Sequence, residues 1–152
     1  MIRISSPLAF LLLASCSGEA GAPQIEVKDA WVRPTVGAGQ MTAGYATIVN
    51  SGGANDRLIG AETDAAAKVT LHSSSNKNGI ARMRPLANGL PVGGGGTATL
   101  SPGGNHLMLE QLSRPLAPGQ SVRLTLRFEK AGEKVVTAAV RNEPATTGHE
   151  GH

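Results

Sequence analysis

The sequence predicts an all-β fold, a Greek-key β-sandwich within a single domain. Short stretches alternate between apolar and polar residues, with Gly, Pro, Asn and Asp between them. No window of eleven or more residues carries the 3.6-residue stripe of an amphipathic helix. Many short strands at this spacing favour two packed antiparallel sheets of the immunoglobulin-like kind over a doubly wound α/β fold.

The first segments in chain order are an export signal and a lipid anchor. Arg3 precedes an apolar run from Leu8 to Leu13, and the segment closes with Leu-Ala-Ser-Cys, ending at Cys16. The run is far shorter than the roughly 20 residues of a spanning helix, so we expect residues 1–15 to be removed as a signal peptide. The closing tetrapeptide resembles the bacterial lipobox, which implies lipidation of Cys16. An ordinary signal peptide with an incidental thiol is the alternative.

A lipoprotein anchored at the periplasmic face is therefore expected. Ser17, the residue after the lipidated cysteine, resembles the outer-membrane sorting pattern and favours the outer membrane over the inner one. Residues 16–23 have the composition of a flexible tether, and residues 24–143 are expected to form the folded domain. Residues 144–152 are polar and predict a mobile tail that contains histidines.

Charge and cysteine content exclude several classes of function. The chain has 14 Lys and Arg against 11 Asp and Glu, and these charges are scattered singly, so no nucleic-acid-binding patch is visible. The only cysteine is Cys16. The folded domain therefore has no disulfide, no catalytic thiolate and no Cys-ligated zinc.

The strand that the pattern predicts most clearly spans residues 122–128, where apolar and polar residues alternate strictly and one face must point inward. The other expected strands lie around 25–33, 43–50, 56–62, 67–73, 80–86, 97–101, 104–110 and 134–141. Glycine-rich segments between them are turns. Gly93 to Gly96 lacks the following Lys-Ser/Thr and helix of a phosphate-binding loop, so it is also interpreted as a loop.

Two histidines and a methionine fall on the polar phase of their strands. Leu107 and Leu109 share the apolar phase, whereas His106 and Met108 point the opposite way. His72 likewise lies out of phase with the apolar residues before it. A methionine beside a histidine on a polar face is not what core packing produces, so the pair is interpreted as metal ligands.

Met83 is a further candidate ligand, although core packing is an open alternative because Arg82 and Arg84 flank it. Thioether sulfur is a soft donor that suits Cu(I), whereas zinc, calcium and magnesium sites use other ligands. A blue-copper centre needs a Cys thiolate, which the mature domain lacks. His72, Met83, His106 and Met108 together therefore predict a Cu(I) site without electron-transfer chemistry.

At these residues the chain resembles the periplasmic copper(I) chaperones called PCu(A)C. His72 is followed after ten residues by Met83, and after twenty-two more by His106-Leu107-Met108. The family gap before the His-x-Met pair is one residue shorter, and Ser74 stands where many members have a further ligand. The resemblance extends over about residues 25–141. It implies a cupredoxin-like β-domain that delivers Cu(I) to the binuclear copper centre of cytochrome c oxidase.

Three other residues are candidate accessory metal ligands. Met41 lies in a Gly-rich region, where a partly buried gap-filling role is the alternative. His149 and His152 are suited to Cu(II), or are incidental residues of a solvated tail. Asn105 and Glu110 are weaker candidates for groups that orient an imidazole.

Three functions remain open at this point. The first is a monomeric copper(I) chaperone that passes its ion to the apo copper subunit of cytochrome c oxidase or to another copper chaperone. The second is a copper-sequestering or resistance lipoprotein without a dedicated partner, and the third is a metal-free interaction module. No Ser-His-Asp or comparable pattern surrounds His72 or His106, so the protein is not expected to be an enzyme.

Overall fold

The computed structural model describes residues 21–37 and 39–143, and in that part of the chain it contains ten strands and no helix. The expected leader, Cys16, most of the tether and the tail residues His149 and His152 lie outside the described residues. The strands are β1 (Ile25–Val32), β2 (Met41–Asn50), β3 (Asp56–Thr63), β4 (Ala66–Lys77), β5 (Ile80–Pro85), β6 (Leu90–Val92), β7 (Thr97–Leu100), β8 (Asn105–Leu112), β9 (Ser121–Phe128) and β10 (Gly132–Val140).

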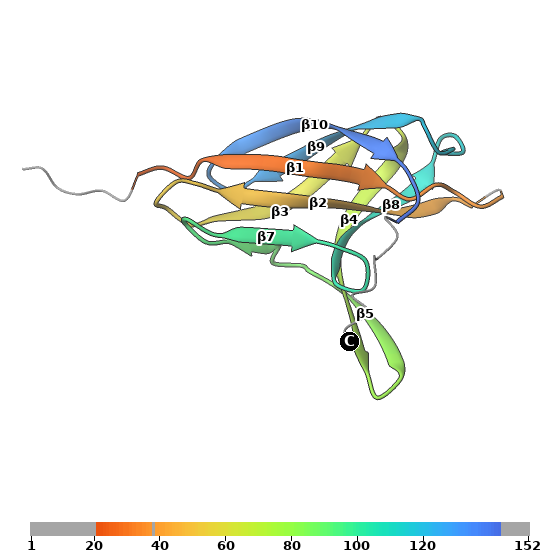
Figure 1. Ribbon diagram of the computed structural model, residues 1–152, viewed down its shortest axis with the longest axis horizontal. Helices are drawn as coiled ribbons and strands as arrows, with labels where there is room; N and C mark the ends of the chain where they lie inside the picture. Colours follow the sequence, from red (N-terminus) through yellow and green to blue (C-terminus); the bar gives the residue numbers. More distant parts are fainter. Residues whose placement is uncertain (1–20, 38, 144–152) are drawn as a thin grey trace, which may run out of the picture.

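All ten strands belong to one hydrogen-bonded sheet, ordered β5-β4-β8-β2-β1-β10-β9-β3-β6, with β7 paired to β2. Every pairing is antiparallel except that of β1 with β10. The sheet folds over near this parallel junction, so that β6 at one end of the sheet contacts β2 although no ladder joins them (Figure 1). The expected sandwich is thus made of two layers of one continuous sheet.

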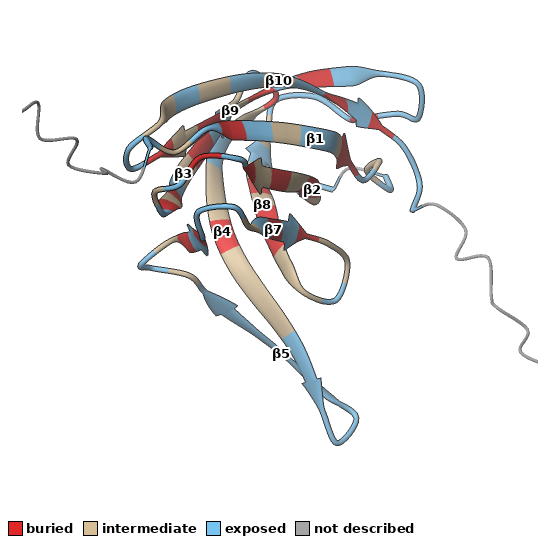
Figure 2. Ribbon diagram, turned by 60° about the vertical axis from the view of Figure 1, so that its left-hand side comes forward, coloured by how far each residue is buried: buried red, intermediate tan, exposed pale blue. Residues whose placement is uncertain are grey.

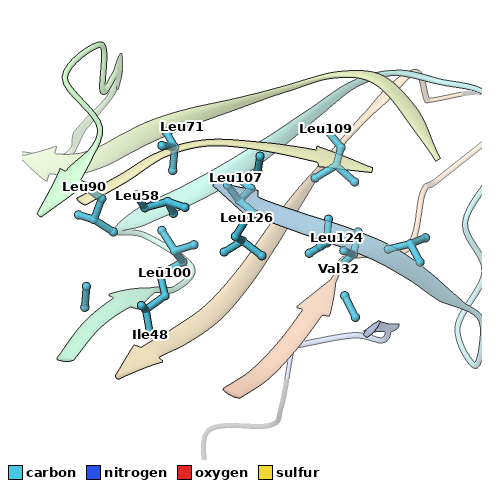
Figure 3. Close-up of a cluster of buried hydrophobic side chains, with 14 of the residues drawn as sticks. Val32, Ile48, Leu58, Leu71, Leu90, Leu100, Leu107, Leu109, Leu124 and Leu126 are labelled. Carbon is cyan, nitrogen blue, oxygen red and sulfur yellow. The ribbon is translucent and has the colours of Figure 1, made fainter. Parts of the chain in front are cut away.

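The core fills the space between the two layers. Ile48 and Leu107 from one layer meet Leu58 and Leu126 from the other (Figure 3), and all four side chains are fully buried. The alternation that predicts the strand at 122–128 is confirmed, since its four apolar residues are buried and Arg123 is exposed. The pairing register of such a strand is fixed, because a slip by one residue would move its apolar side chains into water.

The all-β prediction is confirmed, and the structure adds two features that the sequence pattern did not indicate. β6 was not expected, because it is only three residues long and contains Pro91, which lies at the sheet edge where a missing N–H costs no ladder bond. β4 also runs to Lys77 instead of ending near residue 73, since Asn78 and Gly79, with φ angles of 56° and 77°, form a tight turn into β5.

The long β4–β5 hairpin projects away from the rest of the molecule (Figures 1 and 2). Its outer part, residues 73–85, is called the arm below. Every residue of β5 is exposed, so the arm makes no contribution to the core. None of the helices that a membrane span would require is found in residues 21–37 and 39–143.

Candidate metal centre

Strand register brings the four predicted ligands onto one face of the β5-β4-β8 part of the sheet. His72 lies directly opposite His106, and Thr70 lies opposite Met108. Met83 lies opposite Ser74, and Ser74 is two residues from His72 on β4. Opposite residues in an antiparallel pair, and residues two apart on one strand, share a face. The inner face of the same strands carries the core pair Leu71 and Leu107.

His106 is held in a defined orientation although it points to the outer face. Its side chain is 5% exposed, and its Nδ1–H donates to the carbonyl oxygen of Gly104 at 3.1 Å. Because a carbonyl oxygen only accepts hydrogen bonds, the proton of the neutral ring is on Nδ1. The lone pair of His106 is therefore on Nε2 and is free to bind a metal ion.

His72 is oriented by a chain of three side chains. Its Nε2 lies 3.1 Å from the Thr70 hydroxyl, which donates to Oε2 of Glu110 at 3.3 Å. Lys68 Nζ lies 3.4 Å from the same carboxylate oxygen. The single hydroxyl hydrogen of Thr70 is used on Glu110, so Thr70 must accept from His72 Nε2–H.

The other ring nitrogen of His72 is the unusual group of this face. With the proton on Nε2, Nδ1 carries a lone pair, yet it is buried and has no hydrogen-bond partner among the described residues. A buried polar atom without a partner is costly and calls for an explanation such as an absent ion. The ring centroids of His72 and His106 are 5.8 Å apart, so the two imidazoles are neighbours on this face.

None of the three methionines predicted as ligands is a core residue. Met83 is 51% exposed, Met108 is partly buried and Met41 is 59% exposed. Core packing of Met83 and a buried gap-filling role for Met41 are therefore wrong. Met41 lies opposite Glu110, and Ala43 lies opposite Met108, so Met41 is on the same face as the four predicted ligands.

No group of three or more His, Cys, Asp and Glu residues in the described part of the chain could hold a metal ion. A metal site on this face would therefore have to combine the two imidazoles with other donors, and the thioether sulfurs are on the same face. A set of two neutral nitrogen donors and two soft sulfur donors would suit Cu(I) better than Zn²⁺, Ca²⁺ or Mg²⁺.

Sequence reasoning missed the role of Thr70 and Lys68 at this site. Glu110 was expected to orient an imidazole directly, but it acts through the Thr70 hydroxyl. Asn105, the other expected partner, makes no side-chain hydrogen bond to either imidazole among the described residues. The available signal was that Lys68 and Thr70 share the strand phase of His72.

An aromatic pair borders the same face on the side of β2. Tyr45 is two residues from Ala43, and its ring lies 4.5 Å from that of Trp31, at an interplanar angle of 40°. Arg33 and Arg141 cover the two rings, with their guanidinium carbons 5.7 and 5.1 Å from the ring centroids. Burial raises the pKa of the Tyr45 hydroxyl, which Arg33 partly offsets and Glu143 reinforces. The pair forms a rigid wall beside the site.

The fold of this chain, a single β-sheet folded into two layers, is that of the PCuAC copper-binding domains. Two solved neighbours support this assignment. A copper-bound PCuAC domain from PmoF2 matches with a TM-score of 0.67 and 27% identity, covering 80% of this chain and 96% of that one. The solution structure of CuI-DR1885 from Deinococcus radiodurans matches with a TM-score of 0.63 and 31% identity over 84% of this chain and 85% of that one.

The chain belongs to the family described as "Putative lipoprotein LpqE-like", whose model matches residues 25–140. A relative named "Putative lipoprotein Lxx21020", from Leifsonia xyli subsp. xyli, is 36% identical over 121 residues, which is 80% of this chain and 72% of the relative. The family and this relative agree with the lipoprotein class indicated by the lipobox at Cys16.

Proposed function

We propose that the protein is an extracytoplasmic copper(I) chaperone that binds one Cu(I) through His72, Met83, His106 and Met108. The observation that carries the proposal is the buried, unpartnered Nδ1 of His72, in a ring whose centroid lies 5.8 Å from that of His106. An ion bonded to both nitrogens would satisfy His72 and use the tautomers that the surrounding hydrogen bonds already fix.

The neighbouring structures support the choice of metal. One is a copper-bound PCuAC domain, and another holds Cu(I), as its designation CuI-DR1885 states. The donor set here, with two thioethers and no thiolate in the described domain, is consistent with the same oxidation state. His149, His152 and the Cu(II) role proposed for them lie outside the described residues and stay a prediction.

The unequal exposure of the proposed ligands supports transfer to a receiving protein. His106 is buried and held by Gly104, whereas Met83 is half exposed on the arm. An incoming cysteine or histidine would replace Met83 first, and the copper would stay Cu(I) and bound throughout. The proposed receiver is the binuclear copper centre of cytochrome c oxidase, with Cys16 tethering the chaperone at the periplasmic face of a membrane.

The test is an anaerobic competition titration with a chromogenic Cu(I) chelator on the monomeric chain of residues 17–152. We expect tight binding of one Cu(I), weakened at least tenfold by Met83→Leu combined with Met108→Leu, because leucine keeps the volume and removes the sulfur. Ile80→Leu, an exposed apolar substitution on the opposite face of the same hairpin, is the matched control.

Binding that is indifferent to Met83 and Met108 would refute the site. Tight binding without transfer to an apo-oxidase copper domain would instead favour a copper-sequestering lipoprotein. A folded chain that binds no copper would favour the third function, a metal-free interaction module.

A further inference from the structure

The arm presents a second surface, on the face opposite Met83. Strand pairing places Arg82 opposite Ser75, Arg84 opposite Ser73 and Ile80 opposite Lys77. These six residues therefore share one face, while Ser74 and Met83 point to the other. Lys77, Arg82 and Arg84 make this surface strongly cationic, and it is called the cationic face below.

The cationic face has no compensating acidic groups. The sequence has no Asp or Glu between Asp64 and Glu110, a stretch that includes the whole arm. Among the described residues, no carboxylate lies within ion-pair distance of Lys77, Arg82 or Arg84, whereas Arg33, Arg57 and Arg127 each pair with a glutamate. Three like charges on one exposed hairpin, held without partners, attract an anionic surface.

The cationic face is continuous with a ligand of the proposed copper site. Lys77, Ile80, Arg82 and Arg84 line an open hollow of about 740 Å³, and Met83 also borders it on the edge strand β5, although its side chain alternates to the other face. Ile80 and Met83 are 58% and 51% exposed, so the hollow offers apolar contacts inside a rim of positive charge. An occupant of this hollow would touch the cations and Met83 together.

We infer that the cationic face is the docking surface for an acidic patch on the protein that receives the copper. This inference rests on the proposed function, because the partner is identified as the receiver from the shared position of Met83. A protein fits better than a lipid headgroup, since copper exchange needs a ligand-bearing surface beside Met83 and the hollow supplies apolar side chains for such a surface.

The experiment compares copper transfer from three proteins that span residues 17–152. They are the wild type, the triple variant Lys77→Gln, Arg82→Gln, Arg84→Gln, and a charge-matched control, Arg114→Gln, Arg123→Gln, Lys130→Gln. The control side chains are exposed and make no ion pair among the described residues. The probe is the apo, soluble copper domain of a bacterial cytochrome c oxidase with a negative net charge.

We expect the triple variant to transfer Cu(I) at least tenfold more slowly at low ionic strength, with a flattened salt dependence. The control variant should transfer at the wild-type rate. Cu(I) affinity, measured separately with the chelator, should be equal in all three proteins. Absence of Cu(I) binding by the wild type would refute the proposed function itself. That outcome is distinguishable from failure of the docking inference, in which Cu(I) still binds.

Three outcomes would overturn the docking surface while leaving copper binding intact. The first is transfer that is equally fast from the triple variant or equally slow from the control. The second is self-association of the triple variant with an unchanged transfer rate, since charges on an edge strand also prevent aggregation. The third is binding of the wild type to phosphatidylcholine vesicles containing phosphatidylglycerol, lost in the triple variant, without an effect on transfer.

Discussion

The two imidazoles of the candidate metal centre are held in opposite tautomers. A backbone carbonyl fixes the proton of His106 on Nδ1, and the Thr70 hydroxyl fixes that of His72 on Nε2. A metal ion between them would thus meet Nε2 of one ring and Nδ1 of the other. Side chains that fix a ligand's tautomer typically change metal affinity by 10- to 100-fold when removed, so Thr70 should affect copper binding without touching the ion.

Replacing Thr70 tests this positioning role. Thr70→Val keeps the shape of the side chain but removes the acceptor for His72 Nε2–H, so we expect Cu(I) affinity to fall about tenfold. Histidine nitrogen-15 correlation spectra of the apo protein should show the Nε2–H form of His72 in the wild type and a mixture of tautomers in Thr70→Val. Thr70→Ser should behave as the wild type. An unchanged tautomer in Thr70→Val would reduce Thr70 to a packing residue.

Among the elements, β3 stabilises the turn between β9 and β10 through one carboxylate. Asp56 accepts backbone hydrogen bonds from Arg57, Lys130 and Ala131 at 2.8 to 2.9 Å. Burial disfavours its ionised form, but the three N–H donors and the charge of Lys130 outweigh this effect and hold the pKa of Asp56 below its ordinary value. The ionised carboxylate therefore stabilises the fold.

The sign of this pKa shift gives a pH dependence. A lowered folded-state pKa provides stability that is present above about pH 4, the pKa of an unfolded Asp, and is lost as the pH falls through the folded-state value. Asp56→Ala should cost about 1–3 kcal/mol in urea unfolding at pH 7, and the cost should shrink at pH 3. Glu26→Gln, exposed on β1, should change stability by less than about 0.5 kcal/mol at either pH. A pH-independent cost for Asp56→Ala would contradict the assignment.

Longer strands with one buried face were predictable in position and extent, whereas the short β6 and the outer part of β4 were not. β9 has one buried face and one more exposed face, and β8 buries Leu107 and Leu109 on its inner face, so both strands show alternation in the sequence. The arm has no buried face, and its run Ser73-Ser74-Ser75 carries no such signal, which is why the extent of β4 was underestimated. The shared face of Met108 and His106 was readable from one strand. The unpartnered Nδ1 of His72 depends on cross-strand register, which no single strand encodes.

In the whole molecule, the proposed ligands tie the arm to the body. His106 and Met108 come from β8, His72 comes from the body end of β4, and Met83 comes from β5 of the arm. β8 in turn lies between β4 and β2 and buries Leu107 and Leu109 against the second layer. A bound ion would therefore connect the most exposed strand of the molecule with one of its most buried strands.

Copper loading should consequently stabilise the entire domain. A ligand that binds only the folded state adds about 2.7 kcal/mol to the free energy of unfolding when its free concentration is one hundred times the Kd. Anaerobic thermal unfolding in a chelator-buffered Cu(I) series should show the midpoint rising with free Cu(I). At the same free Cu(I), Met108→Leu should show a smaller rise than the wild type. A midpoint independent of Cu(I) would contradict a site built from the folded strands.

The alternation of core and ligand along β4 and β8 has an evolutionary consequence. Leu71 and Leu107 face inward, whereas their neighbours His72 and His106 face outward. One residue inserted within either strand would turn imidazoles into the interior and leucines into water at the same time. Point substitutions can therefore modify the face that carries the proposed ligands while the core persists. Changes in strand length would alter that face and the core together. Variation in length should be confined among relatives to turns such as Asn78-Gly79, where the arm can lengthen by whole pairs of residues.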